Sequence, residues 1–397
     1  MKRGAWHQCG DSSQTIAREL LEMGAGVGVI ISPRDLLFPK AIEYAEHFHG
    51  LGAEVLIDPQ FYVPDYTNTK LASYPTAPHR TSVSELQKIG DADLSNLAAE
   101  LQAMNAGVAA NAVITPALAY QSSSPGIAEL NARLFGAAKA ASDAMGLPTY
   151  ASVVLGRSAV ASMPAINEAI SHATALDADG WYFAFEFEAE RIPTSRQEVY
   201  RCCDAGLTLA CTGKPVLHAF AGPMALLSLA FGATGAAIGH RQNLWRFNPG
   251  RWQVSTEQGG SGAAPPRFFS STLWGTIVHP DETARLSAAI RGAVITPSPF
   301  LGGATIPPQD WPRLAASKHF VFTVCEIVAG LAASTDARQI AHMAKERLQS
   351  GAAIYEQIVN DGVFMRDAPN AYHVNWCSAL DDLLTHNNDD FDFLDLL

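Results

Sequence analysis

The chain has 397 residues, of which 48% are apolar and 17% charged, and its 27 basic and 39 acidic residues give a formal net charge of −12. This composition predicts a globular protein with one large core, with or without a smaller satellite, and argues against bulk nucleic-acid binding over the whole surface. No apolar run has the roughly 18 to 20 residues of a membrane span, and the opening MKRGAWHQCG lacks the apolar core of a secretory signal. We therefore expect a cytoplasmic protein without membrane contact.

Helical and strand patterns alternate from the start of the chain. A helix is predicted from a cap at 11–13 to Met23, then a strand at 27–32, a helix at 41–49 and a strand at 54–58. The last of these strands ends at Asp58. A carboxylate at the mouth of a barrel strand can read a ligand's hydrogen-bond donors or remove a proton, so Asp58 is a candidate catalytic residue. Aspartate before proline is also common turn chemistry, and a capping role stays open.

The middle of the chain continues the alternation. Residues 62–79, rich in proline, tyrosine and threonine, predict a long loop over the strand ends, of the kind that forms lids or binding loops. Helices are then predicted at 84–105, 127–145, 165–175 and 195–212, and strands at 112–119, 149–155 and 181–188.

The strand at 181–188, WYFAFEFE, alternates strictly. Its phenylalanines share one face, and Glu186 and Glu188 share the other with Ala184. At the top of a barrel the inward face could hold a carboxylate for a ligand, which makes Glu186 a candidate catalytic residue and Glu188 a candidate substrate-binding residue. The alternative is that both lie in the following loop and are simply solvated.

In the stretch from Lys214 to Phe247, the spacing of the apolar residues changes twice. It predicts a strand at 216–221, a helix at 224–231 and a strand at 236–239, followed by a loop rich in arginine and aromatic residues. Loops after strand ends bind ligands in parallel α/β folds. The candidate substrate-binding residues in this loop are His240, Arg241, Trp245 and Arg246. His240 and Arg241 could bind a phosphate or pyrophosphate. Trp245 or Trp252 could stack on a base. Alternatively, the loop packs against the insertion at 255–266 with its arginine stems covering apolar surface.

Strand starts about 30 residues apart through some 220 residues predict a parallel sheet, either closed as a barrel or wound in the open. We favour a TIM-like (β/α)8 barrel over residues 1–290. Seven strands are assigned, and the eighth is sought in RFFSSTLWGTIVHP, which could also hold an edge element. His218, within the sixth strand, either points into the barrel or is a satisfied core histidine.

Two segments follow the predicted barrel. Residues 291–366 predict a helical flanking subdomain whose helices run from 311 to 331 and from 336 to 359. Residues 367–397 form an acidic tail, whose last nineteen residues place six aspartates among phenylalanine and leucine. Such tails dock on a partner protein, dock on their own chain, or only keep the protein soluble. A protein partner that binds the tail is therefore one of the alternatives.

The cysteines do not predict a metal site. Cys202 and Cys203 are adjacent, and Cys9, Cys211, Cys325 and Cys377 are isolated, whereas metal-binding cysteines come in spaced pairs. We expect buried free thiols, no metal and no other cofactor.

Three segments resemble the tRNA-guanine transglycosylase superfamily, whose barrels exchange guanine for a 7-deazaguanine base. DADGWYFAFEFEAERIPTSRQEVYR is similar to the family's glycine-rich strand and following helix, KPVLHAFAGPMALLSLAFGATGAAIGH to its strand, helix and nucleophile-bearing strand, and the segment from Lys318 to Ile358 to its closing helices. GAEVLIDPQFY is similar to the strand whose aspartate reads and deprotonates the base. The resemblance implies that role for Asp58, and a setting in bacterial DNA-modification or anti-phage gene clusters, including type IV CBASS systems.

The sequence departs from the family at the positions that carry its chemistry. The strand at 235–239 lacks the aspartate that would attack the anomeric carbon of the sugar. Bulkier Ala184, Phe185 and Glu186 replace the glycine-rich base pocket. The region of the family's zinc site retains only His319, and one histidine cannot hold the metal.

Two classes of function therefore stay open. The first is a divergent transglycosylase-like protein that binds, with or without transferring it, a guanine or 7-deazaguanine-type base or a related nucleotide, with Asp58, Glu186 or Glu188 reading its donors. The second is a catalytically inactive barrel that serves as a recognition or scaffold subunit. The oligomeric state is open, a homodimer included.

Overall fold

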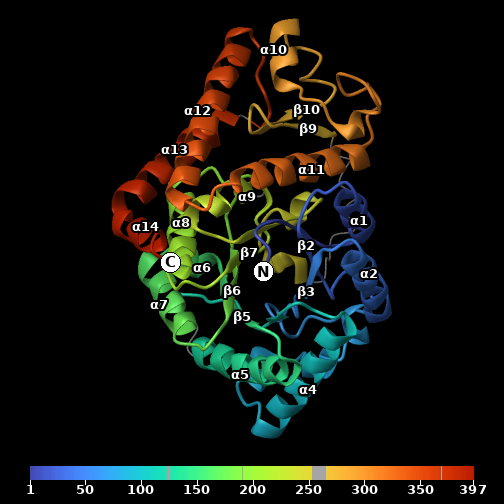
Figure 1. Ribbon diagram of the computed structural model, residues 1–397, viewed down its shortest axis with the longest axis vertical. Helices are drawn as coiled ribbons and strands as arrows, with labels where there is room; N and C mark the ends of the chain where they lie inside the picture. The colour runs from blue at the N-terminus through green and yellow to red at the C-terminus, as the bar shows by residue number, and fades with distance from the viewer. Residues whose placement is uncertain (123–125, 190, 253–264, 368) are drawn as a thin grey trace.

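The computed structural model describes residues 1–122, 126–189, 191–252, 265–367 and 369–397 (Figure 1). Its centre is a sheet of eight parallel strands in the order β3-β2-β1-β8-β7-β6-β5-β4. The strands are β1 (Gly4–Gln8), β2 (Gly28–Ile31), β3 (Glu54–Ile57), β4 (Val113–Ile114), β5 (Thr149–Leu155), β6 (Gly180–Phe185), β7 (Val216–His218) and β8 (Gly235–Ile238). The sheet curls into a nearly closed barrel, and the predicted TIM-like (β/α)8 fold is confirmed.

The position predicted for the eighth strand is wrong. The missing strand is β1, which lies between β2 and β8 and is hydrogen-bonded to both. Its sequence, GAWHQ, escapes pattern recognition because His7 and Gln8 interrupt the apolar run. Both are nevertheless buried, and His7 Nε2 lies 2.8 Å from the carbonyl oxygen of Ala25. The segment where we sought the strand forms an antiparallel pair outside the barrel, β9 (Arg267–Ser270) and β10 (Gly275–Val278).

The barrel closes between β3 and β4 through a single residue. The backbone N–H of Asn111 donates to the carbonyl of Val55 at 2.9 Å, and the side-chain oxygen of Asn111 accepts from the N–H of Val55 at 2.7 Å. The seam therefore uses one backbone and one side-chain hydrogen bond where the other neighbouring strands share a ladder.

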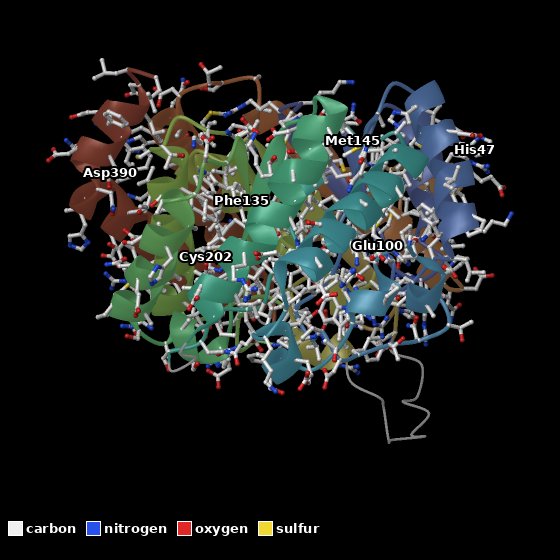
Figure 2. The ribbon with its side chains drawn as sticks, turned by 90° about the horizontal axis from the view of Figure 1, so that it is seen from below. His47, Glu100, Phe135, Met145, Cys202 and Asp390 are labelled. Carbon is white, nitrogen blue, oxygen red and sulfur yellow. The ribbon has the colours of Figure 1, made fainter. Side chains whose placement is uncertain are left out.

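Helices cover the outside of the barrel, and Figure 2 shows several of them side by side, including α4 and α5. They are α1 (Gln14–Glu22), α2 (Phe38–Gly50), α3 (Val83–Leu86), α4 (Asp91–Gly107), α5 (Ile127–Met145), α6 (Arg157–Val160), α7 (Met163–Thr174), α8 (Arg196–Ala210) and α9 (Ala225–Ser228).

Strand alternation divides the apolar side chains into two layers, as β6 illustrates. Trp181, Phe183 and Phe185 belong to the core between strands and helices, whereas Tyr182 and Ala184 belong to the core inside the barrel. His218 lies in the outer layer with its Nδ1 atom 2.8 Å from the hydroxyl of Ser228, so it is a satisfied core histidine. Burial lowers the pKa of His218 to about 3 and keeps it neutral.

A flank and a tail follow the barrel. The flank packs β9 and β10 against α10 (Ala288–Val294), α11 (Arg313–Leu331) and α12 (Ala337–Asn360), around an apolar core of its own. Helix α11 has the length and apolar composition of a membrane-crossing helix, yet half of it is buried against β1, α9 and β9, as in the core helix of a folded domain.

All six cysteines are free thiols, and Cys9, Cys202, Cys203 and Cys325 are buried.

The acidic tail packs on the chain itself. It forms α13 (Pro369–His386) and α14 (Asn388–Leu394), and α13 lies against α8 and α12. Trp376, Leu380 and Phe391 are almost fully buried, and Asp382 accepts two hydrogen bonds from the guanidinium of Arg196 at 2.5 and 2.7 Å. The aspartates therefore face outward while the interleaved apolar residues supply the docking surface.

Candidate ligand site

Asp58 lies directly after β3, at the carboxyl end of the barrel, and is only 1% exposed. One of its oxygens accepts from the backbone N–H of Gln60 at 2.9 Å, and the hydroxyls of Tyr62 and Tyr182 donate to the carboxylate at 2.9 and 3.0 Å. Burial raises the pKa of Asp58 to about 6, even though these hydrogen bonds and the charge of Arg80 oppose the shift. The group can thus titrate near neutral pH, but it does not face solvent.

Aromatic side chains fill the mouth of the barrel above Asp58. The ring of Tyr62 meets those of Phe220, Phe247 and Trp252 edge to face, with centroids 6.4, 5.0 and 5.2 Å away. All four residues are at most 6% exposed. The open, carboxylate-lined mouth that we expected for a flat ligand is therefore wrong, because rings from three separate loops close it.

Glu186 and Glu188 form a network of their own. Glu186 accepts from the backbone N–H of Arg157 at 2.7 Å, and Glu188 forms an ion pair with the Arg157 guanidinium at 2.7 Å. The Glu188 side chain is 77% exposed. Neither glutamate shares a hydrogen-bond partner with Asp58 among the residues described, so the predicted grouping of the three carboxylates is wrong. The solvated-loop alternative describes Glu188.

The loop after β8 sends its side chains to different places. Arg246 donates to the backbone carbonyls of Phe187 and Glu188 at 3.0 and 2.9 Å, which fastens two loops together. Arg251 pairs with Asp35 at 2.9 Å in an almost fully buried ion pair. The insertion at 255–266, named as an alternative packing partner of this loop, lies largely outside the described residues.

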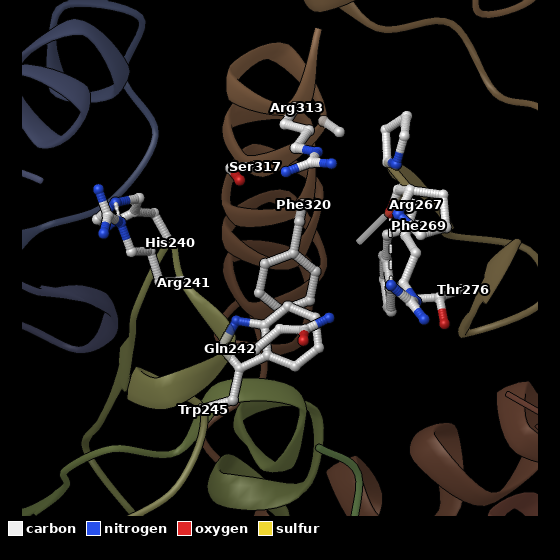
Figure 3. Close-up of a pocket in the computed structure, with 13 residues that line it drawn as sticks. His240, Arg241, Gln242, Trp245, Arg267, Phe269, Thr276, Arg313, Ser317 and Phe320 are labelled. Atoms are coloured by element: carbon white, nitrogen blue, oxygen red, sulfur yellow. Dashed lines mark hydrogen bonds between the residues drawn. The ribbon is translucent and has the colours of Figure 1, made fainter. Parts of the chain in front are cut away.

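His240, Arg241 and Trp245 meet at an open pocket of about 240 Å³ beside the barrel mouth (Figure 3). Its wall comes from three places: the loop after β8, the strands β9 and β10, and one face of α11. The residues contributed by the strands and the helix include Arg267, Phe269, Thr276, Arg313, Ser317 and Phe320.

The pocket is strongly cationic. Arg241, Arg267 and Arg313 line it, and the first turn of α11, which begins at Arg313, borders it. The positive end of a 19-residue helix dipole adds to these charges. Among the described residues, Arg241 is held by a long contact of 3.7 Å to Asp11 and a hydrogen bond of 3.3 Å from its Nε atom to His240, and Arg313 forms no hydrogen bond or ion pair. Both guanidinium groups are therefore available to an anion.

His240 contributes a hydrogen-bond donor. Burial lowers the pKa of His240 to about 4, with a further contribution from the charge of Arg241, so the ring is neutral at physiological pH. The Nε atom of Arg241 donates to Nε2 of His240 at 3.3 Å, which leaves the ring proton on Nδ1. Nδ1 is buried and has no partner among the described residues. An anion in the pocket would supply the missing acceptor.

Trp245 forms a fixed apolar wall. Its indole stacks on Phe320 with centroids 4.2 Å apart, and its N–H donates to the carbonyl of Gly239 at 3.0 Å. Figure 3 shows this stack below Arg313 and Ser317. The indole is thus held in place before any ligand binds.

No model of a known protein family matches the sequence, and no curated protein sequence matches it either. Among solved structures, the chain is similar to a candidate dihydrodipicolinate synthetase from Pseudomonas aeruginosa, with 13% identity over 62% of this chain and 73% of that one and a TM-score of 0.33. It is similar to an L-ribulose 3-epimerase with 13% identity over 60% of this chain and 81% of that one and a TM-score of 0.34. Similarity at this level says nothing about ligand or reaction.

Sequence reasoning missed the half of the pocket that comes from the flank. Arg313, Ser317 and Phe320 recur at the spacing of one helical face, a signal that could have been read. Arg267 and Thr276 could not be placed, because their segment was left open between an eighth barrel strand and an edge element. His319, which the sequence comparison aligned with a zinc-binding region, lies with its Nε2 atom 2.8 Å from the carbonyl oxygen of Phe269. Among the described residues, no group of three or more histidine, cysteine or acidic side chains could hold a metal ion.

Proposed function

We propose that this TIM-barrel protein binds a phosphate-bearing small molecule of nucleotide type in the cationic pocket and acts as a recognition protein. One observation carries the proposal: the unpartnered N–H of His240 lies with Arg241 in the same pocket as Arg313 and the amino end of α11. Arginines and free backbone N–H groups are the donors that bind phosphate best. The stacked rings of Trp245 and Phe320 supply an apolar surface for the rest of the molecule.

The absence of a placed nucleophile favours recognition over base exchange. Strand β8, from Gly235 to Ile238, carries no carboxylate that could attack a sugar, and Asp58 is sealed beneath the aromatic rings. Transfer would need both a nucleophile and an open route to it.

Calorimetric titration with guanosine monophosphate, guanosine and inorganic phosphate tests the proposal. We expect the monophosphate to bind and guanosine to bind at least ten-fold more weakly, because the arginines would lose their partner. Arg313→Ala should weaken binding of the monophosphate roughly 10- to 100-fold, as expected for one charge-assisted hydrogen bond. The matched control is Arg246→Ala, which removes an arginine of the loop after β8 that is engaged with backbone carbonyls outside the pocket. Equal binding of guanosine and its monophosphate would refute the proposal.

A second candidate, binding of a guanine or 7-deazaguanine-type base at Asp58, is favoured by Gln8. Its amide is 1% exposed and interacts with the hydroxyl of Tyr182, and among the described residues neither of its polar atoms makes a well-aligned hydrogen bond. A heterocycle entering beneath displaced rings could satisfy the amide of Gln8 and the carboxyl of Asp58 together. Titration of the wild type and of Asp58→Asn with guanine and 7-deazaguanines decides this candidate, since identical curves would remove Asp58 from any site.

The biological setting that we propose, a bacterial modification or antiviral defence pathway, rests on the sequence resemblance alone. Identifying by mass spectrometry the small molecule that co-purifies with the protein would test it together with the ligand class.

A further inference from the structure

We propose that the cationic pocket is one lobe of a two-lobed site, whose second lobe takes the uncharged, hydroxyl- and amine-bearing half of the ligand. This inference rests on the proposed function and names the part of the ligand that the arginines do not select. In a nucleotide, that half is the nucleoside.

A second cavity of about 410 Å³ adjoins the first. Trp245, Arg267 and Thr276 line both, so these three residues form the wall between the lobes. The remaining wall of the second lobe comes from the loop after β6, from the connection of α12 to α13 and from α13 itself: Ala189, Arg191, Ile192, Thr194, Asp367 and Tyr372. The two lobes together fall within the range of about 300–1,000 Å³ that is typical of small-molecule sites.

The second lobe differs from the first because both of its arginines, Arg191 and Arg267, are paired with one carboxylate. Asp367 accepts from Nε of Arg267 at 2.8 Å, from the hydroxyl of Thr276 at 2.7 Å and from Arg191 at 3.3 Å. Burial alone would favour the neutral acid, but the bonds from Arg267 and Thr276 hold the pKa of Asp367 below its usual value. Because Asp367 holds both arginines, this lobe offers no free guanidinium to a phosphate, whereas the remaining lone pairs of the carboxylate can accept from hydroxyl and amino groups.

The polarity of the site therefore fixes the direction of the ligand. A phosphate is drawn toward Arg241 and Arg313 in the first lobe, and sugar hydroxyls or ring amines are drawn toward Asp367 in the second. Arg267 cannot swing between them, because its side chain is 10% exposed and Asp367 holds its Nε atom. Ile192 and the indole of Trp245 add apolar surface on which a planar ring can lie.

Filling the second lobe while leaving the first intact tests this inference. Thr194 is exposed and lines only the second lobe, so Thr194→Trp places a large side chain there without burying new polar atoms. Thr385→Trp, at an exposed position on α13 that lines neither lobe, is the matched control. The probes are inorganic phosphate and the four ribonucleoside monophosphates, titrated calorimetrically into each variant after its melting temperature has been shown to equal that of the wild type.

We expect at least one monophosphate to bind wild-type protein ten-fold or more tightly than phosphate does. Thr194→Trp should abolish that advantage and leave phosphate binding unchanged, whereas Thr385→Trp should change neither. If monophosphate and phosphate bind equally, or if Thr194→Trp leaves the advantage intact, the second lobe is refuted and the phosphate pocket stands. If neither probe binds the wild type, both proposals fall.

Discussion

Two regions at the carboxyl ends of the barrel strands make opposite use of the same kinds of residue. Above Asp58, the rings of Tyr62, Phe247 and Trp252 pack edge to face and leave no open space. Beside β8, Trp245 lines an open pocket in which Arg313 is unpaired among the described residues. Most of these residues come from one loop of thirteen residues, 240–252, so composition alone does not decide which side chains close a cavity and which line one. The path of the backbone decides it.

The largest effect should come from opening the closed region. Trp252→Ala removes a ring that is 1% exposed and leaves a cavity, so we expect the free energy of unfolding to fall by about 3–5 kcal/mol in urea titrations. Phe364→Ala, at a side chain that is 72% exposed, should change it by less than about 0.5 kcal/mol. A loss below about 1 kcal/mol for Trp252→Ala would mean that the rings above Asp58 are not a packed core.

Asp58 should make the free energy of unfolding depend on pH. Because burial raises the pKa of Asp58 to about 6, above its usual value of 3.8, the folded state retains a proton that the unfolded chain loses as pH rises between these values. The carboxyl should therefore destabilise the protein by about 3 kcal/mol above pH 6 relative to pH 3.8. Compared across that interval, the unfolding free energy of the wild type should decline relative to that of Asp58→Asn. Parallel profiles for the two proteins would show that Asp58 is not buried as described.

Gln8 should show the cost of an unsatisfied amide in the closed region. Gln8→Leu removes two buried polar atoms that make no well-aligned hydrogen bond among the described residues, so we expect the unfolding free energy to rise by about 1–2 kcal/mol. The control is Gln60→Leu, whose amide bonds Ser32 at 2.9 Å and accepts from the N–H of Arg34 at 3.1 Å, and which should destabilise the protein by about 1–3 kcal/mol. A loss of stability in Gln8→Leu would show that the amide has a partner.

The smallest effect on stability is expected in the open pocket. Arg313 is exposed and unpaired among the described residues, so Arg313→Ala should change the unfolding free energy by less than about 0.5 kcal/mol while it weakens ligand binding. Arg251→Ala, which breaks a buried ion pair, should cost about 3 kcal/mol or more. Similar losses in the two variants would erase the distinction between the regions.

The sequence predicted the elements whose patterns are long and regular. The alternation of WYFAFEFE placed the phenylalanines of β6 on one face, and the helix at 127–145 has the bounds that its apolar stripe indicates. It failed at β1, because five residues with two polar members carry no periodicity, and only the count of seven strands pointed to a missing one. The closed mouth was beyond local patterns, since it depends on rings that meet from distant loops. Phe220 even takes a left-handed backbone conformation, with φ of 52°, in its place there.

The place of β1 between β2 and β8 bears on how the chain is made. A ribosome synthesises the residues of β1 more than two hundred residues before those of β8, so one edge of β1 must wait, unpaired, through most of translation. Contacts between such distant parts of a chain slow folding, and they prolong the time for which an unpaired strand edge is exposed to aggregation. Chaperones that shield nascent chains would therefore be expected to matter more for this protein than for one whose neighbouring strands are also neighbours in sequence.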